Sequence, residues 1–539
     1  MKQAHDPSLT QVNVLIKNNE MKKHFILFSS LTLLALTSCD SWLLEPTPGV
    51  TKLEDFFTVG KTAIQTTNAA YVPLMWEFSS TYYPEWFIGD VVSDDALKGG
   101  QSFSDMADVY DLENFKTNAN NGLLLDFYRA QYQGIARCNL PLTQIPSMET
   151  DDDMTPAVQS RLIGELKFLR AMYYFRLVRV FGGVPLVTAP IESKESWKQA
   201  RATSEAIYAQ IISDLTEANA CLWIKSKYPL TDLGRATKGA AQAMLLKANL
   251  YMHNYAAAEI WGDSIIASDE YSLTTNYNDN FTLAGENGPE SVFEIQYMED
   301  PTSDYGEGNG YTRGTFTPIL TRSRSSKLGG GWGFNKPTQN LYDEYEAGDP
   351  RRDSTILNPT DAQIETPEQE IYLGSRYLNR KYAMMNPDGT FYKLTHATRG
   401  PINTKVIRFA DVLLMYAEAC CENGHLTEAK DALEKVRARA RGNAAILPAF
   451  PYGSYTDTKD DLRAAIRHER RVELAMEGHR WFDLCRWGVA KQVMDAYKAG
   501  ETAEAQSHMA TFILGKHELF PIPSKEIDLN PMDQNPLYE

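Results

Sequence analysis

The stretch of residues 155–187 constrains the fold most, because it has the pattern of one long helix with apolar residues on two adjoining faces. Thr155 can cap the first free amides, Pro156 suits the first turn, and Gly182 and Gly183 end the helix. One face carries Leu162, Leu166, Leu169, Tyr173, Leu177 and Val180, and the other carries Phe168, Met172 and Phe175. A helix that is covered from two sides predicts a large α-rich body around it.

The composition agrees with such a body and excludes several classes of function. A chain of 539 residues with 43% hydrophobic content can bury a large core in one or two domains. Its formal charge of −17 argues against nucleic-acid binding, which needs a positive field. The six cysteines are too few and too scattered for a disulfide framework, and none has the spacing of a zinc site. We therefore expect no nucleic-acid partner, no metal and no cofactor.

The N-terminal region has the pattern of an export signal. Two lysines follow Met21, and an apolar run extends over residues 25–36. Twelve helical residues span about 18 Å, well short of the ~30 Å hydrocarbon core, so this run is a signal-peptide segment and not a membrane span. It ends in Leu-Thr-Ser-Cys, which resembles the bacterial lipobox, in which the cysteine is acylated and becomes the mature N-terminus. This resemblance implies that Cys39 is a lipid anchor.

These observations divide the chain into three parts. Residues 1–20 are polar and precede a complete signal, so we interpret them as an extension upstream of the true start. Residues 21–38 are the lipoprotein signal peptide. Residues 39–539 form the mature chain, which we predict to be a single domain.

Helical periodicity returns along most of the mature chain. It predicts helices at residues 56–76, 123–145, 155–181, 203–222, 409–423, 426–441, 460–476 and 483–498, and another that Thr237 caps. The segments that begin at Leu245 and Leu414 resemble each other and look like degenerate tetratricopeptide helix pairs, although ordinary helix hairpins would give the same pattern. Between them lies an irregular insert of about residues 271–404, with one strand-like run at residues 292–297. A loop region this long is uncommon unless it is functional.

Charged residues crowd the segment of residues 467–488, RHERRVELAMEGHRWFDLCRWG. Opposite charges recur there at spacings of three and four, which predicts a buried ion-pair network between the last two helices. A catalytic cluster is the alternative. His468 and Glu469 lack the second histidine of a zinc-protease motif, and the chain has neither a nucleophile-elbow nor a phosphate-loop motif.

Six motifs in order carry a family resemblance. They are the lipobox with Leu44-Glu45-Pro46, FLRAMYYFRLVRVFGGVPLV, the segment Arg235–Ala240, VIRFADVLLMYAEA from Val406, ERRVELAMEGHRWFDLCRWG from Glu469, and LFPIP with the QNP at Gln534. Each motif is weak alone, but the ordered set resembles the SusD/RagB family of outer-membrane nutrient-binding lipoproteins over essentially the whole mature chain.

The resemblance implies a mostly α fold with about four tetratricopeptide-like helix pairs and an irregular ligand-binding region with minor β structure. It also implies a lipoprotein, anchored through Cys39 in the outer membrane and exposed at the cell surface. Such a protein would capture a glycan, or a peptide as RagB-like members do, and dock on a SusC-like TonB-dependent transporter. It would not be an enzyme.

A surface that captures sugars needs flat apolar rings on exposed loops, with hydrogen-bonding groups around them. Two loops offer this combination. The candidate ligand-binding residues are Tyr82, Tyr83 and Trp86 in the first loop, Trp332 and Phe334 in the second, and Tyr305 and Tyr311 as additions. Arg324, with Arg322 and Lys327, precedes Trp332 and could recognise a carboxylate or sulfate, or form a solvated basic loop.

Two other functions stay open at this point. The chain has 70 Asp and Glu residues, so composition cannot exclude a glycoside hydrolase that uses two carboxylates. A scaffold of helical repeats that binds only protein is the other alternative. Incubation with glycans separates them, because an enzyme turns glycans over, a capture protein binds them unchanged, and a scaffold does neither.

Overall fold

Helix α7 (Pro156–Phe181) begins and ends where the sequence predicts, in a computed structural model that describes residues 56–77, 84–194, 196–299, 313–386, 388–397 and 399–538. The Thr155 side chain accepts a hydrogen bond from the amide of Val158, and Gly182 ends the helix with a φ of 71°. All nine apolar residues of the two predicted faces are buried. The expectation of a helix covered from two sides is confirmed.

The C-terminal segment caps the end of α7. The Asn535 side-chain amide donates to the Phe181 carbonyl over 3.0 Å and to the Phe520 carbonyl over 2.6 Å. The amide of Phe520 donates to the carbonyl of Val180 over 2.8 Å. The last turn of a helix leaves its carbonyls without partners inside the helix. The QNP motif therefore stabilises the central helix, although it lies more than 350 residues after it.

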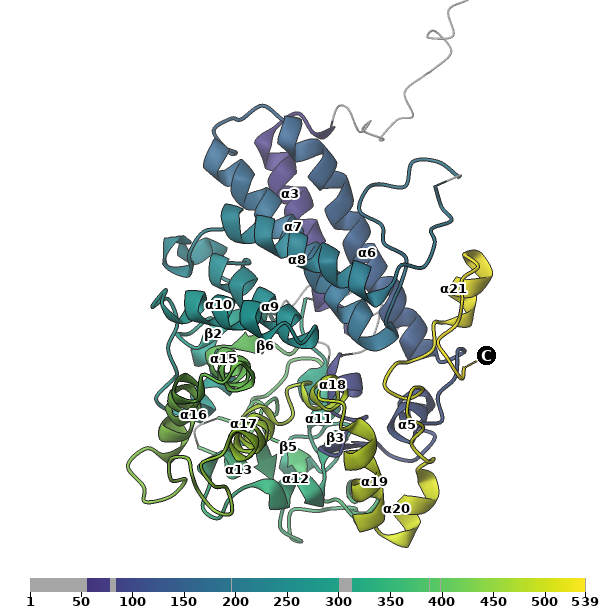
Figure 1. Cartoon of the computed structure of the whole chain (residues 1–539). Coiled ribbons are helices and arrows are strands. Elements are labelled where there is room, and N and C mark those ends of the chain that lie inside the picture. Colours follow the sequence, from purple (N-terminus) through teal and green to yellow (C-terminus); the bar gives the residue numbers. More distant parts are fainter. Residues whose placement is uncertain are drawn as a thin grey trace, which may run out of the picture. The chain divides into compact units, whose positions relative to one another are not determined.

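Four consecutive helix pairs form the framework of the fold (Figure 1). They are α3 (Gly60–Tyr71) with α6 (Gly122–Gln144), α7 with α8 (Ser204–Cys221), α9 (Lys238–Tyr251) with α10 (Tyr255–Ile266), and α15 (Phe409–Asn423) with α16 (Leu426–Arg441). Each pair contacts the next one along the chain. The mostly α fold and its repeated helix pairs are confirmed.

Glycines allow neighbouring helices of this framework to approach closely. A Cβ atom at Gly134 of α6 would lie 2.3 Å from the Tyr173 ring of α7, and one at Gly262 of α10 would lie 2.5 Å from Tyr416 of α15. The second contact joins the two repeats on either side of the long insert. The insert therefore leaves the helix stack after α10 and returns to it at α15 without separating the two pairs.

The minor β structure of the described residues consists of three antiparallel pairs of strands, and most of these strands belong to the insert. Strand β1 (Ala96–Gly99) pairs with β3 (Phe334–Pro337), β2 (Ser291–Ile295) with β6 (Thr404–Arg408), and β4 (Ile356–Leu357) with β5 (Leu378–Asn379). Strand β6 runs directly into α15. Strand β2 matches the predicted strand, and its pairing with β6 fixes both ends of the insert against the helices.

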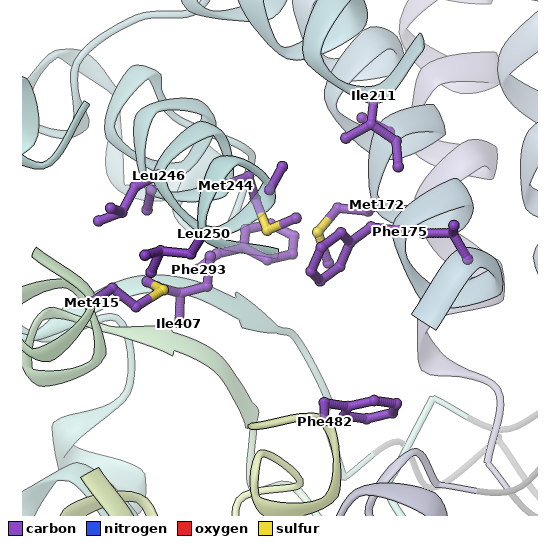
Figure 2. Close-up of a cluster of buried hydrophobic side chains, with 14 of the residues drawn as sticks. Met172, Phe175, Ile211, Met244, Leu246, Leu250, Phe293, Ile407, Met415 and Phe482 are labelled. Atoms are coloured by element: carbon purple, nitrogen blue, oxygen red, sulfur yellow. The ribbon is translucent and has the colours of Figure 1, made fainter. Parts of the chain in front are cut away.

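The hydrophobic core lies where the helix pairs meet the β2–β6 ribbon. Figure 2 shows Met172 and Phe175 of α7, Met244 of α9, and Phe293 and Ile407 of the two strands in one buried cluster. The Phe293 ring meets the Phe168 ring edge-on, with 4.9 Å between centroids. Full burial of one such side chain stabilises a fold by about 1.5–3 kcal/mol.

Two local predictions differ from the structure. The predicted helix of residues 483–498 is two helices, α18 (Arg480–Arg486) and α19 (Ala490–Gly500), because Gly488 adopts a left-handed conformation with a φ of 68°. The region predicted as a loop at residues 79–100 contains helix α4 (Trp86–Gly89) and strand β1 in its described part.

Residues Phe57–Glu539 form one compact unit. Within the described residues, no helix combines the length and the apolar composition that crossing a bilayer requires. Cys39 and the signal peptide lie outside the described residues.

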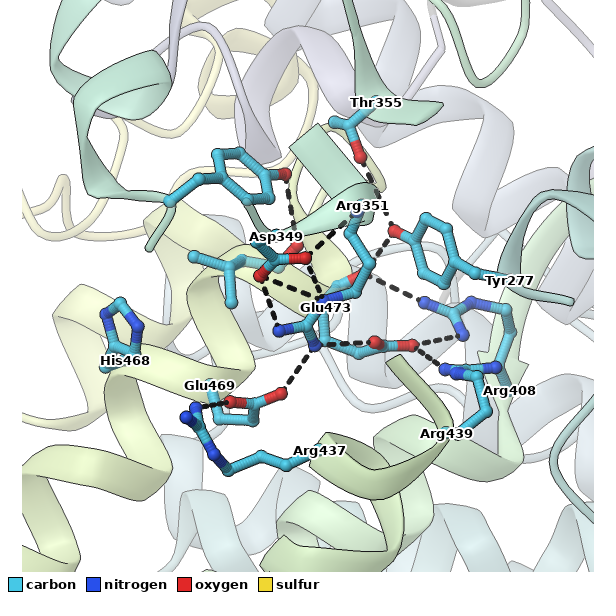
Figure 3. A network of polar contacts seen from close by, with 12 residues as sticks. Tyr277, Asp349, Arg351, Thr355, Arg408, Arg437, Arg439, His468, Glu469 and Glu473 are labelled. Atoms are coloured by element: carbon cyan, nitrogen blue, oxygen red, sulfur yellow. Dashed lines mark hydrogen bonds and ion pairs between the residues drawn. The ribbon is translucent and has the colours of Figure 1, made fainter. Parts of the chain in front are cut away.

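Two glutamates of α17 (Lys459–Leu474), Glu469 and Glu473, form the centre of a fully buried ion network (Figure 3). Arg351, from α13 (Pro350–Thr355), pairs with both of them, at 2.5 Å and 3.0 Å. Arg437 of α16 pairs with Glu469 at 2.7 Å, and Arg408 at the end of β6 pairs with Glu473 at 3.0 Å.

The predicted buried network is thus confirmed, but its extent differs from the prediction. One ion pair does join the last two predicted helices, since Arg470 contacts Asp483 at 2.7 Å. Most partners of the α17 charges lie instead on segments distant in sequence, including Arg351 inside the insert and Arg408 just after it. Sequence spacing along one segment could not show these partners.

The arginines keep the buried glutamates ionised. Burial alone would raise the pKa of Glu473, but Arg439, Arg408 and Arg351 hold that pKa at about 2. Burial opposes ionisation of Glu477 as well, and Arg408 and Lys381 hold its pKa at about 2. Because both pKa values lie below the ordinary value of 4.5, this contribution to stability is present above pH 4.5 and is lost as the pH falls toward 2.

We expect Glu473→Gln to lower the free energy of unfolding by about 3–5 kcal/mol, because it leaves buried arginines without their counter-charge. Urea unfolding at pH 7 measures the loss. Asp460→Asn on the same helix is the control, since the Asp460 side chain is 89% exposed and surface ion pairs contribute about 0–1 kcal/mol. Between pH 4.5 and 2 the variant should also lose less stability than the unmodified chain. An equal, small effect for both substitutions would contradict the role of the network.

Candidate ligand-binding site

Trp332 lies in a glycine-rich loop, residues 329–333, which backbone hydrogen bonds hold in place. The amide of Trp332 donates to the carbonyl of Ile319 over 2.8 Å, and the amide of Gly333 donates to the carbonyl of Arg322 over 2.9 Å. A Cβ atom at Gly331 would lie 2.5 Å from the carbonyl oxygen of Arg322, so only glycine fits at this position. The loop conformation is therefore fixed by its backbone contacts.

The structure brings the two predicted loops together at their described ends. In the β1–β3 pair, Gly99 lies opposite Phe334. The amide of Gly100 donates to the carbonyl of Gly333 over 2.9 Å. The segment after Trp86 therefore ends directly beside the glycine loop, although the two are more than 200 residues apart in sequence.

Of the described aromatic candidates, only Trp332 is partly exposed. Its side chain is partly buried and packs against the margin of the core. The other described aromatic candidates, Trp86 and Phe334, are only 5% and 2% exposed.

The prediction that Trp86 and Phe334 are exposed platforms is therefore wrong. Helix α4 turns the Trp86 ring inward, where its Nε1 donates to the Thr317 hydroxyl over 3.2 Å. Phe334 is buried, like the rest of strand β3. Phe87 lies between them, with its ring centroid 4.0 Å from that of Trp86 and 6.1 Å from that of Phe334. These three rings form a buried cluster at the start of β3, which directly follows the glycine loop. Tyr82, Tyr83, Tyr305 and Tyr311 lie outside the described residues.

The arginines before Trp332 already have partners in the protein. Arg324 forms an ion pair of 2.9 Å with Asp105, and its side chain is 20% exposed. Arg322 is 3% exposed, donates from Nε to the Ala383 carbonyl over 2.7 Å, and lies over the Phe391 ring at 5.5 Å. Desolvation lowers the Arg322 pKa to about 10. The alternative of a solvated basic loop does not describe Arg322, which is a buried structural residue.

A short ribbon that sequence analysis did not single out borders the glycine loop. Met385 pairs with Phe391, and the amide of Tyr392 donates to the carbonyl of Met384 over 2.8 Å. A Cβ atom at Gly329 would lie 2.8 Å from the Phe391 ring, so the ring contacts the loop directly. Asn386 and Gly389 are typical turn residues and could have predicted this ribbon. We call the paired residues 384–386 and 390–392 the Phe391 ribbon.

A separate internal cavity next to Trp86 is too small for a sugar. Its volume is about 60 Å³, which holds only a few water molecules. Charged groups that line it have partners inside the protein; Glu85, for example, pairs with Arg176 at 3.1 Å and with Arg179. Burial lowers the pKa of His479 to about 3, so this histidine is neutral at ordinary pH. Among the described residues, no group of histidine, cysteine and carboxylate side chains could hold a metal ion.

Two family models match consecutive parts of the chain. The first, described as "Starch-binding associating with outer membrane", matches residues 77–251. The second, described as "SusD family", matches residues 289–538. Among curated relatives, SusD-like protein P38 of Formosa agariphila is 28% identical and covers 86% of this chain and 91% of its own length. The starch-binding protein SusD of Bacteroides thetaiotaomicron is 24% identical and covers 73% of this chain and 75% of its own length.

Solved structures of SusD-like and surface glycan-binding proteins also match this chain. A laminarin binding SusD-like protein is 29% identical, with a TM-score of 0.74, and the match covers 89% of this chain and all of the other. Surface glycan-binding protein A from Bacteroides thetaiotaomicron, in complex with laminarihexaose, is 25% identical with the same TM-score and coverage. The two family models, these relatives and the shared architecture of helix pairs show that the chain belongs to the SusD/RagB family.

Proposed function

We propose that this protein captures a neutral oligosaccharide at the cell surface and delivers it to a SusC-like TonB-dependent transporter in the outer membrane. The observation that carries the proposal is the full-length similarity to a laminarin binding structure, combined with a rigid loop that presents Trp332. The description of the matched family model names association with the outer membrane, which supports this location.

Trp332 would supply a flat apolar surface for a sugar ring. Stacking that buries roughly 100 Å² contributes about 2.5 kcal/mol before other costs. Together with one or two further contacts of this size, the Trp332 contact would give dissociation constants from high micromolar to millimolar. Weak capture suits delivery, because the transporter must be able to take the ligand over.

The charges around the loop favour a neutral ligand over an acidic one. Arg324 is neutralised by Asp105, and Arg322 is buried beneath the loop. Lys327 is exposed, and its Nζ donates to the Ala362 carbonyl over 3.0 Å. A carboxylate or sulfate would have to displace these internal contacts, whereas a neutral sugar needs only a ring surface and hydrogen-bonding groups.

The chain is a binding protein and not an enzyme, as its family membership shows. We therefore expect a purified glycan to be bound and recovered without cleavage.

Docking on the transporter needs little intrinsic affinity. A lipid on Cys39 would confine the protein to the membrane that holds the transporter, and confinement raises the effective concentration of the two partners. One acyl chain holds a protein only marginally. The several chains of a lipoprotein cysteine add about 0.8 kcal/mol for each buried CH₂ group and make the anchor stable.

Trp332→Ala should weaken oligosaccharide binding at least tenfold, because it removes the stacking surface. Isothermal titration calorimetry with laminarin and starch oligosaccharides measures the change. Trp197→Ala is the matched control, since Trp197 is a tryptophan with 59% exposure on another loop. Trp332→Phe should retain part of the affinity. Normal binding by Trp332→Ala, or a melting temperature lowered by more than a few degrees, would show that Trp332 is a bystander or a core residue.

Cys39→Ala should release the protein from the membrane, because the acylated side chain is gone. Fractionation followed by a salt wash measures the release, in a strain that lacks the transporter so that docking cannot retain the variant. Recovery of the variant in the washed membrane fraction would contradict lipid anchoring.

Affinity purification of the unmodified protein from detergent-solubilised membranes should recover a large barrel protein of the SusC type. Retrieval of an established transporter pair under the same conditions is the positive control. If the control pair is recovered and this protein is repeatedly recovered alone, the proposed partnership is wrong.

A further inference from the structure

The Phe391 ribbon separates the glycine loop from a second and larger pocket. Adjacent residues of an extended strand point to opposite faces. Phe391 contacts Gly329 on one face, and Tyr392 lines the pocket on the other. The pocket therefore lies on the other side of the ribbon from the glycine loop that carries Trp332.

The pocket has the size and the lining of a sugar-binding site. Its volume of about 570 Å³ is within the range of about 300–1,000 Å³ that small-molecule sites occupy. Three asparagines, Asn276, Asn278 and Asn386, line it together with Tyr392. A side-chain amide has donors and an acceptor. It can therefore donate to the oxygen of a sugar hydroxyl group or accept a hydrogen bond from it.

Asn278 is available to a ligand. Its backbone amide is used, since it donates to the Asn276 side chain over 3.3 Å. Its side-chain amide has no hydrogen-bond partner among the residues that the structure describes, although the residue is partly buried. Tyr392, by contrast, is anchored, because its hydroxyl donates to Glu299 over 2.6 Å. The pocket thus combines a fixed ring with an unused amide.

The charges of the pocket cancel. Among its described lining residues only Arg380 and Asp279 are charged. Arg380 donates to the Asp353 carbonyl over 2.7 Å, and Asp279 accepts from the Asn276 side chain over 2.8 Å. An anionic ligand would meet one partly used arginine and a nearby carboxylate. A neutral polyhydroxyl ligand would meet amides and an aromatic ring.

We propose that this pocket is a second binding site for a neutral oligosaccharide, separated from the glycine loop by the Phe391 ribbon. The inference rests on the proposed function, because it takes the same class of ligand. Trp332 and Tyr392 then contact different parts of one oligosaccharide, or two oligosaccharide molecules. The Phe391 ribbon lies between the two contact points.

Two substitutions test the pocket in different ways. Ala284→Trp fills it, because Ala284 is an exposed lining residue, and Asn278→Ala removes the unused amide. Ala256→Trp on the exposed side of α10 is the matched control for added bulk. The probes are hexasaccharides from laminarin and starch, which are neutral, and from pectin, which is acidic.

The unmodified chain should bind a neutral hexasaccharide in calorimetry. Ala284→Trp should weaken that binding at least fivefold and Asn278→Ala about threefold, whereas Ala256→Trp should leave it unchanged. Hydrogen exchange should show that the ligand protects residues 276–284, also in the Trp332→Ala variant at millimolar ligand.

The outcomes separate the two proposals. If the unmodified chain binds no probe, the proposed function fails and the pocket inference fails with it. If it binds, and Trp332→Ala weakens binding while Ala284→Trp and Asn278→Ala do not, the proposed function stands and the pocket inference is overturned. Binding of the acidic probe alone, weakened by Ala284→Trp, would overturn the neutral ligand class.

Discussion

The ion pairs of Glu469 and Glu473 are the interaction on which the rest of the structure depends. Both carboxylates are fully buried, and their arginine partners come from α13, α16 and the end of β6. Buried charges are costly unless they are fully paired, so few other arrangements of these side chains would be stable. The network fixes the insert to the helical framework, because Arg351 lies within the insert and Arg408 lies just after it, at the end of β6.

This attachment explains how an irregular region can present a defined surface. The described insert contains only short strands, so hydrogen bonding between strands cannot hold it in place alone. The ion network supports it from the α17 side, and backbone hydrogen bonds to Ile319 and Arg322 hold the glycine loop. Rigid support matters for weak binding, because a loop that is already ordered loses little entropy when a ligand binds.

The sequence predicted the helical framework well and the site less well, for physical reasons. Long helices such as α7 carry their periodicity and their caps in local sequence, and Thr155 and Gly182 mark its ends. Burial of a loop aromatic depends on contacts far away in sequence. The Trp86 indole, for example, donates to Thr317, which is 231 positions later, and no local pattern shows this contact. The pocket beside the Phe391 ribbon was missed for the same reason, since its asparagines come from separate segments of the insert.

A crystal structure of the mature chain with a bound oligosaccharide, selected by calorimetry, tests the central claim most directly. We predict that a sugar ring lies against the Trp332 indole, with the glycine loop in the conformation described here. A well-ordered oligosaccharide elsewhere on the protein, with Trp332 free of it, would contradict the assignment of this loop as the capture surface.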